Sequence, residues 1–112
     1  AKRFAKVGVE MVSLASVEGV VAEVSPGHHH AFVAVADSRK GERLVLVTDA
    51  DGIDRAGIGE ALRKRGMSEL NLPAEVMKVD ALPLLGTGKT DYPAIQKMLD
   101  ERQAGAKATA EA

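Results

Sequence analysis

"LPLLGTGKTDYPAIQ", Leu82–Gln96, places one lysine, Lys89, between a glycine-containing bend and the expected start of a helix. Gly86 and Gly88 supply the unusual backbone dihedrals that tight bends need. A lysine at a helix N-terminus is electrostatically unfavourable, because the helix dipole there favours negative charge. The position of Lys89 therefore suggests that its charge acts on something outside the helix.

The segments on either side of this bend predict a strand before it and a helix after it. "AEVMKVDAL", residues 74–82, alternates in the manner of a strand. Thr90 or Asp91 can cap the helix, and Pro93 is tolerated in its first turn. The apolar face of this helix comprises Tyr92, Ile95, Met98 and Leu99. Residues 104–112 have no apolar stripe, so we expect a disordered tail there.

The N-terminal half predicts a hairpin, a helix and a second hairpin. Arg3–Val12 alternates loosely around a glycine, which predicts a short strand or hairpin interrupted by a bend. Ser13 can cap a helix that ends at "SPG", residues 25–27. The apolar face of this helix comprises Leu14, Val17, Val21 and Val24. "HAFVAVADSRKGERLVLVTD", residues 30–49, predicts two strands around a polar turn, at the centre of the sheet.

A second helix is marked at both of its ends. Asp54 can cap it, Ile53 and Ile58 are placed to form a hydrophobic staple, and Gly66 can stop it. "SELNLP", residues 68–73, predicts one helical turn. This order of elements predicts an α+β fold, a small sheet with a central hairpin and about three strands, flanked by about three helices, plus an N-terminal strand or hairpin.

The composition excludes several classes of function. The 112 residues suffice for one compact domain. With 15 Lys and Arg against 16 Asp and Glu, nothing indicates a nucleic-acid partner or an anionic membrane surface. There is no cysteine, which excludes disulfides and thiolate catalysis. No apolar run approaches the roughly 18 residues that cross a bilayer, so we expect a soluble fragment on the cytoplasmic side.

Three interpretations of the Lys89 bend compete. A phosphate-binding P-loop would share the glycine-lysine-threonine ending, but its pattern G-x-x-x-x-G-K-[ST] needs glycine where this chain has Pro83. In a solvated turn, the glycines only shape the backbone and Lys89 is an exposed charge. The third interpretation is a resemblance that uses both ends of the chain.

The two ends of the chain resemble motifs of one superfamily. "LPLLGTGKTDY", residues 82–92, resembles the C-terminal P-x-x-x-x-G-K motif of adenylate-forming enzymes, which include acyl-CoA synthetases, nonribosomal peptide adenylation domains and luciferases. "KRFAKVGVEMVSLASVE", residues 2–18, resembles the hinge-and-hairpin motif that opens their small C-terminal domain. It ends in a segment of the E-I-E type, here Ser16, Val17 and Glu18.

This resemblance implies that residues 1–103 form the mobile C-terminal lid of an ATP-dependent acyl-activating ligase, inactive alone. ATP and Mg²⁺ would bind mainly to an N-terminal domain of the same chain. A fatty acid would become acyl-AMP and then an acyl thioester on acyl carrier protein or coenzyme A. Lys89 would enter the active site during adenylation, on a loop supported by Gly86, Thr87 and Gly88, whose glycines would let the loop enter and withdraw.

The resemblance also assigns roles at the N-terminal end. Arg3 falls at the hinge residue, about which the lid would rotate between the two half-reactions. Gly8, Val9, Glu10 and Met11 would form the hairpin that faces pantetheine. Val9 stands where related members have glycine, which bears on the thioester half-reaction.

Within the superfamily, "EMVSL", "KGERLVLVTD", "ELNLP" and "LPLLGTGK" are most similar to the acyl-acyl-carrier-protein synthetase part of the bifunctional 2-acylglycerophosphoethanolamine acyltransferase. The full chain would then carry an acyltransferase as well and associate with the inner membrane. Two other functions stay open, the lid of an acyl-CoA synthetase and a non-catalytic module that binds a carrier protein through its basic turns, residues 38–43 and 63–65, or its hairpin.

The remaining polar residues indicate structural roles. The side chains of His28, His29 and His30 alternate in direction along an extended segment and cannot all converge on one ion. Asp49 and Asp51 are interpreted as turn and helix-entry residues. We therefore expect no metal site in this chain. The four methionines, Met11, Met67, Met77 and Met98, are expected to fill gaps in the core or at an interface.

Overall fold

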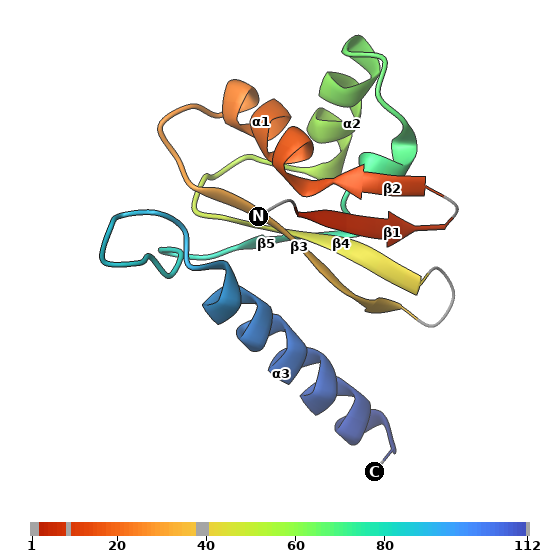
Figure 1. Ribbon diagram of the computed structural model, residues 1–112, viewed down its shortest axis with the longest axis vertical. Helices are drawn as coiled ribbons and strands as arrows, with labels where there is room; N and C mark the ends of the chain where they lie inside the picture. The colour runs from red at the N-terminus through yellow and green to blue at the C-terminus, as the bar shows by residue number, and fades with distance from the viewer. Residues whose placement is uncertain (1–2, 9, 38–40, 112) are drawn as a thin grey trace.

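The sheet is built around β4 (Gly41–Thr48), as Figure 1 shows. The computed structural model of the protein describes residues 3–8, 10–37 and 41–111. β3 (His30–Asp37) pairs antiparallel with β4 along one edge. The opposite edge of β4 is shared by β5 (Glu75–Lys78), which runs parallel to it, and by the end of β1 (Phe4–Val7). β2 (Glu10–Ser13) pairs antiparallel with β1 and completes the sheet, which has five strands within the described ranges.

Helices cover both faces of this sheet (Figure 1). α1 (Leu14–Val24) and α2 (Arg55–Lys64) lie on one face, and α3 (Tyr92–Glu111) lies on the other. A short 3-10 helix, η1 (Glu69–Asn71), follows α2 and precedes β5. The predicted α+β class, with its central hairpin, flanking helices and N-terminal hairpin, is confirmed. Among the helices in the described residues, none has the length and hydropathy that a membrane span requires.

The central strand β4 serves two hydrophobic cores, because consecutive side chains of a strand point to opposite faces. Leu44 and Leu46 belong to the core beneath α1 and α2. Val45 and Val47 belong to the core beneath α3. Burial on both faces accounts for the uninterrupted apolar run of this strand, which a half-exposed strand would not show.

α1 begins at its predicted cap, but its apolar face differs from the prediction. The Ser13 hydroxyl oxygen accepts a hydrogen bond from the Ser16 backbone N–H at 3.3 Å. The buried residues of α1 are Leu14, Val17, Val20 and Val21. Val24 is 46% exposed, so its predicted place on the buried face is wrong. Val24 is the last residue of α1 and borders a surface hollow lined partly by Glu60 and Lys64, beyond the core.

α2 has the start and the end that the sequence predicts. The Asp54 carboxylate accepts a hydrogen bond from the Gly57 N–H at 2.8 Å, and Ile58 in the first turns is buried. Gly66 has a φ of 68°, and the N–H of Met67 donates to the carbonyl of Leu62 at 3.0 Å. This is the helix ending in which a glycine takes the left-handed conformation.

Asp91 caps the start of α3, and its carboxylate accepts a hydrogen bond from the Ala94 N–H at 3.1 Å. Of the predicted apolar face, Ile95 and Leu99 are fully buried, Tyr92 is half-buried, and Met98 is 36% exposed. The helix continues to Glu111, into the segment for which the sequence predicts a disordered tail. Alanine, glutamate and lysine dominate this segment and favour helix without any apolar stripe. The predicted domain boundary at residue 103 stays a prediction.

Candidate functional site

The segment that carries Lys89 is a closed turn tied across its base. Leu84 and Thr90 form an antiparallel bridge, and the N–H of Leu85 donates to the carbonyl of Lys89 at 2.7 Å. Below this bridge, the N–H of Asp91 donates to the carbonyl of Pro83 at 2.9 Å. We call residues 83–91 the Lys89 turn. Its ends cannot separate without breaking these bonds, and the buried Leu82 before it and the helix α3 after it anchor the turn to the domain.

Only one of the two glycines in this turn needs to be glycine for conformational reasons. Gly88 has a φ of 88°, and its N–H donates to the carbonyl of Leu85 at 2.9 Å. Gly86 lies outside the positive-φ region, and a Cβ added there would meet no atom within 4 Å. Thr87 between them is exposed. Because the N–H groups of Leu85 and Gly88 bond within the turn, they are not free to cradle a phosphate, and the P-loop interpretation gains no support.

The side chain of Lys89 takes no part in the bonds that hold the turn. It is exposed and makes no hydrogen bond or ion pair with any residue in the described part of the chain. Its neighbours Leu84 and Leu85 are each 46% exposed, while Leu82 at the base is buried in the α3-side core. The turn thus presents one ammonium group beside two apolar side chains on an anchored base.

The side chain of Arg3, the predicted hinge residue, differs from that of Lys89 because it is bonded within the domain. Its guanidinium donates to both carboxylate oxygens of Glu18, at 2.9 and 2.8 Å, and to the carbonyl of Phe32 at 2.6 Å. It also lies 3.6 Å from the centre of the Tyr92 ring, a cation–π contact. The backbone carbonyl of Arg3 accepts the N–H of Leu14 at 3.0 Å.

Glu18 is the acceptor at the centre of this arrangement. Besides Arg3, it accepts the Tyr92 hydroxyl at 2.8 Å and the N–H of Phe32 at 2.7 Å. Burial, and then the hydrogen bond and negative charge of Glu18, raise the pKa of Tyr92 to about 12. Burial, the largest single influence, would lower the pKa of Arg3, but the hydrogen bond and negative charge of Glu18, together with smaller contributions from Tyr92, raise this pKa overall. We call these three residues the Arg3 cluster.

The β1–β2 hairpin lies at the end of the domain opposite to the Lys89 turn (Figure 1). Gly8 has a φ of 62°, which supplies the predicted bend. Glu10 is half-buried and Met11 is 61% exposed at the start of β2. Val9 lies outside the described residues. The structure therefore places the two groups of predicted site residues at opposite ends of the domain.

His28 and His29 both contact Asp49, the residue that follows β4. The ring Nδ1 atoms of His28 and His29 lie 3.3 and 3.1 Å from the two carboxylate oxygens of Asp49. Burial would raise the pKa of Asp49, but hydrogen bonds from the backbone and ring of His29, and from His28, lower it overall. His30 is buried and bonds Thr48 Oγ1 and the Ser25 carbonyl, each at 2.8 Å. No group of three histidines or carboxylates in the described ranges could hold a metal ion.

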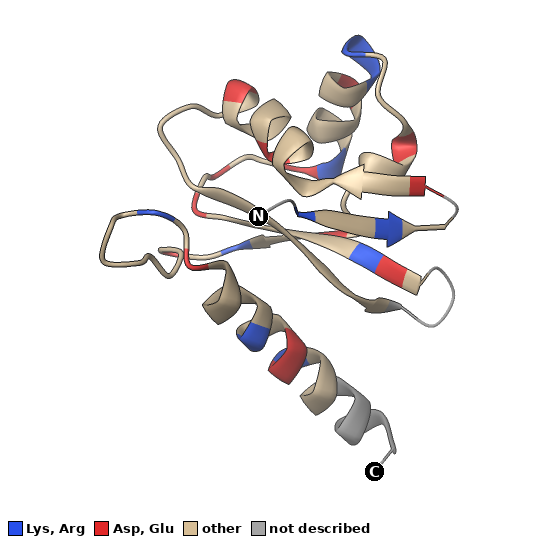
Figure 2. Cartoon of the chain, in the orientation of Figure 1, with Lys and Arg blue, Asp and Glu red and all other residues tan. Residues whose placement is uncertain are grey.

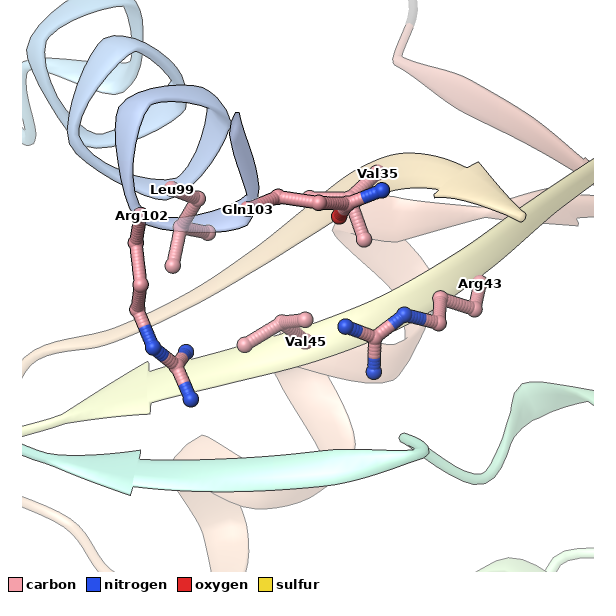
Figure 3. Close-up of a pocket in the computed structure, with 6 residues that line it drawn as sticks. All are labelled: Val35, Arg43, Val45, Leu99, Arg102 and Gln103. Carbon is pink, nitrogen blue, oxygen red and sulfur yellow. The ribbon is translucent and has the colours of Figure 1, made fainter. Parts of the chain in front are cut away.

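A hollow of about 110 Å³ lies between α3 and the sheet (Figure 3). Arg43 and Arg102 face each other there across the apolar side chain of Val45. Both guanidinium groups pair with Glu75, at 4.0 Å for Arg43 and through a hydrogen bond for Arg102. One carboxylate thus offsets one of the two positive charges, and the pair of Arg102 with Glu75 joins α3 to β5. Figure 2 likewise shows acidic and basic residues interspersed along the elements.

Comparison with known proteins finds solved structures that contain this fold. No protein-family model matches the chain. Among solved structures, apo MbtA of Mycobacterium smegmatis is 27% identical with a TM-score of 0.75, over 86% of this chain and 19% of that chain. A fatty acyl CoA synthetase of Mycobacterium tuberculosis is 26% identical with a TM-score of 0.73, over 85% and 19%. ATP-bound MatB of Rhodopseudomonas palustris is 22% identical with a TM-score of 0.71, over 87% and 20%.

The matched structures are adenylate-forming, acyl-activating enzymes. They agree with the superfamily that the motifs at both ends of the chain resemble. The chain matches their C-terminal domain and spans about a fifth of the length of the matched chains.

Sequence reasoning missed the roles of Glu18 and Tyr92. It used Glu18 only as the end of a motif, and it placed Tyr92 on the apolar face of the last helix. The available signal was the type of these residues, since Tyr92 is the one tyrosine of a chain without tryptophan. A lone tyrosine on an apolar face needs a partner for its hydroxyl group.

Proposed function

We propose that this chain is the mobile C-terminal lid of an ATP-dependent acyl-activating ligase, which converts a fatty acid to acyl-AMP and then to an acyl thioester. The observation that carries the proposal is Lys89, exposed and without a partner among the described residues, on a turn anchored to the domain. The motifs at both ends of the chain and the matched solved structures support it.

Lys89 acts in the first half-reaction. A carboxylate oxygen of the fatty acid attacks the α-phosphorus of ATP, the bond to the bridging oxygen breaks, and pyrophosphate leaves. The ammonium group approaches the carboxylate and the α-phosphate as negative charge shifts between them. Coulombic attraction in a water-poor cleft far exceeds its value in water, and a compact ammonium on a flexible stem can reach such a site. ATP and Mg²⁺ bind mainly to an N-terminal domain.

Delivery of Lys89 requires rotation of the whole domain. Because the base of the Lys89 turn is tied by backbone bonds, the turn does not enter the active site by its own flexing. A hinge at Arg3 supplies the rotation, in the manner of a domain closure about a few residues.

The same rotation serves the second half-reaction. It withdraws Lys89 and presents the β1–β2 hairpin, with Gly8, Val9, Glu10 and Met11, to the incoming pantetheine. The thiol sulfur attacks the acyl carbon, AMP leaves, and the thiol proton is lost to solvent or a base. The positive φ of Gly8 already supplies a bend, which supports a working hairpin with valine at position 9.

The finer assignment is to the acyl-acyl-carrier-protein synthetase part of a bifunctional 2-acylglycerophosphoethanolamine acyltransferase, on the cytoplasmic side of the inner membrane. The sequence likenesses within β2, β4, η1 and the Lys89 turn support it. Acyl carrier protein is then the thiol partner, and coenzyme A is the alternative.

The test is adenylation by the enzyme that contains this domain, measured as fatty acid-dependent ATP–pyrophosphate exchange. We expect Lys89→Ala to lower exchange by roughly 10²-fold to 10³-fold, as removal of one charge-stabilising donor does. Lys97→Ala is the matched control, since Lys97 is also exposed and its ion pair in the described part of the chain is with Glu101 on α3, at 4.0 Å. Equal exchange by the two variants would contradict the role of Lys89, and a chain that binds carrier protein without any adenylation would favour the interaction module.

A further inference from the structure

The Arg3 cluster joins parts of the chain that the two half-reactions use. Arg3 lies beside β1, Glu18 lies in α1, and Tyr92 begins α3 directly after the Lys89 turn. We propose that Glu18 and Tyr92 are positioning residues, which hold the Lys89 turn in fixed orientation to Arg3 so that rotation at Arg3 is transmitted to Lys89. This inference rests on the proposed function and names the residues that make the rotation effective.

Glu18 can hold this position because both of its oxygens are saturated with donors. Two come from the Arg3 guanidinium, one from the Tyr92 hydroxyl and one from the Phe32 backbone N–H. The Glu18 side chain is 13% exposed, so water competes weakly for these oxygens. Bidentate charge-assisted bonds of this kind combine strength with a defined geometry.

From Tyr92 toward Lys89, each step of the backbone is bonded. Asp91 donates its N–H to Pro83 and caps the first turn of α3 with its carboxylate. Thr90 bridges to Leu84, and the carbonyl of Lys89 accepts the Leu85 N–H. The orientation of Tyr92 therefore determines the orientation of the Lys89 backbone, and only the lysine side chain keeps its freedom.

From Tyr92 toward Arg3, the bonds hold the side chain and the carbonyl of Arg3 on the domain. The guanidinium binds Glu18 and the Phe32 carbonyl and stacks on Tyr92, while the Arg3 carbonyl accepts the Leu14 N–H. The Cα–C bond of Arg3 is consequently fixed at both of its ends. A rotation at Arg3 that preserves these contacts takes place about its N–Cα bond.

The test compares the two half-reactions in the enzyme that contains this domain. Tyr92→Phe removes the hydroxyl that binds Glu18 and keeps the ring beneath Arg3. Glu18→Gln keeps the side-chain size and removes the charge. We expect each to lower kcat for acyl-AMP formation by about tenfold, with KM for ATP and fatty acid within about twofold, because misplacement of a catalytic group acts on the transition state. Thioester formation from supplied acyl-AMP should stay within about twofold.

Arg102→Gln is the matched control, because it removes a different ion pair, to Glu75, from the same helix α3. It should leave both half-reactions unchanged. Equal losses in both half-reactions of Tyr92→Phe would indicate a general effect on the fold and overturn the inference. If Lys89→Ala slows adenylation while Tyr92→Phe and Glu18→Gln do not, this inference fails and the proposed function stands; if Lys89→Ala has no effect, the proposed function itself fails.

Amide hydrogen exchange of the chain gives a second readout that needs no catalysis. In Tyr92→Phe, exchange of the Leu85 and Asp91 N–H groups should accelerate by about tenfold relative to Arg102→Gln, since these bonds hold the Lys89 turn. Unchanged exchange would contradict the transmission of orientation from Tyr92 to the turn. This measurement decides the case if Glu18→Gln does not fold.

Discussion

Arg3 and Lys89 are two cations near opposite ends of the sequence, and the structure treats them differently. Arg3 binds both oxygens of Glu18, a backbone carbonyl and an aromatic ring. Lys89 has no side-chain partner within the described residues and extends from a turn whose backbone is tied across its base. A cation whose hydrogen bonds and ion pairs lie inside the domain stabilises the domain. An exposed cation without such a partner is available to an anion outside the domain.

The largest effect on stability should come from removing the acceptor of Arg3. Glu18→Ala leaves the Arg3 guanidinium, the Tyr92 hydroxyl and the Phe32 N–H without their shared partner. Removing one partner of a buried pair costs about 3 kcal/mol, and this pair is only part-buried, so we expect a cost of about 2 kcal/mol. The free energy of unfolding from urea denaturation should fall by about this amount. A loss no greater than that of Glu101→Ala, an exposed residue, would contradict the structural role given to Arg3.

The Arg3 cluster should also make the free energy of unfolding depend on pH at high pH. The folded pKa of Tyr92 is about 12, above the ordinary value near 10, so between these values the unfolded chain loses its proton while the folded chain keeps it. The contribution of Tyr92 to the free energy of unfolding is therefore fully present below pH about 10 and is lost as the pH rises toward about 12. Because Tyr92 is the one tyrosine, tyrosinate absorbance reports it directly. Burial, the largest cause, remains in Glu18→Gln, but the midpoint should still move down from about 12, and an unmoved midpoint would exclude a contribution from Glu18.

The two glycines of the Lys89 turn offer a matched pair of intermediate effect. Gly88→Ala forces a side chain into the left-handed region and should lower the free energy of unfolding by about 1 kcal/mol. Gly86→Ala adds a Cβ in open space and should change it by less than about 0.5 kcal/mol. Thermal melts of the two variants provide the comparison, and equal melting temperatures would show that the turn is not held in the observed conformation.

The smallest effect on stability is expected at Lys89 itself. Lys89→Ala removes an exposed side chain without a partner among the described residues, so the free energy of unfolding should stay within about 0.5 kcal/mol. Urea denaturation measures it beside Glu18→Ala. A loss comparable to that of Glu18→Ala would remove the distinction between the two cations.

Much of the fold could be predicted from the sequence because its signals are local. The caps at Ser13 and Asp54, the glycine that ends α2 and the apolar run of β4 each act within a few residues. The exposed turn at Lys89 was also expected from the glycines around it. Local chemistry also explains the error at Val24, since helical spacing cannot show where the core ends.

The Arg3 cluster could not be predicted, because its bonds join distant parts of the chain. Arg3 and Glu18 are 15 residues apart, and Tyr92 and Glu18 are 74 residues apart. Helical periodicity assigned Tyr92 to the apolar face and gave no sign that its hydroxyl reaches α1. The parallel pairing of β5 with β4 is equally non-local, since it depends on the path of the intervening helix α2.

The central claim is that Lys89 acts outside this domain in one half-reaction only. Its most direct test is the ratio of the two half-reaction rates in Lys89→Ala of the enzyme that contains the domain, each measured in a single turnover. We predict that acyl-AMP formation falls by roughly 10²-fold to 10³-fold while thioester formation from supplied acyl-AMP stays within about twofold. Equal losses in the two steps, or no loss in the first, would contradict the account.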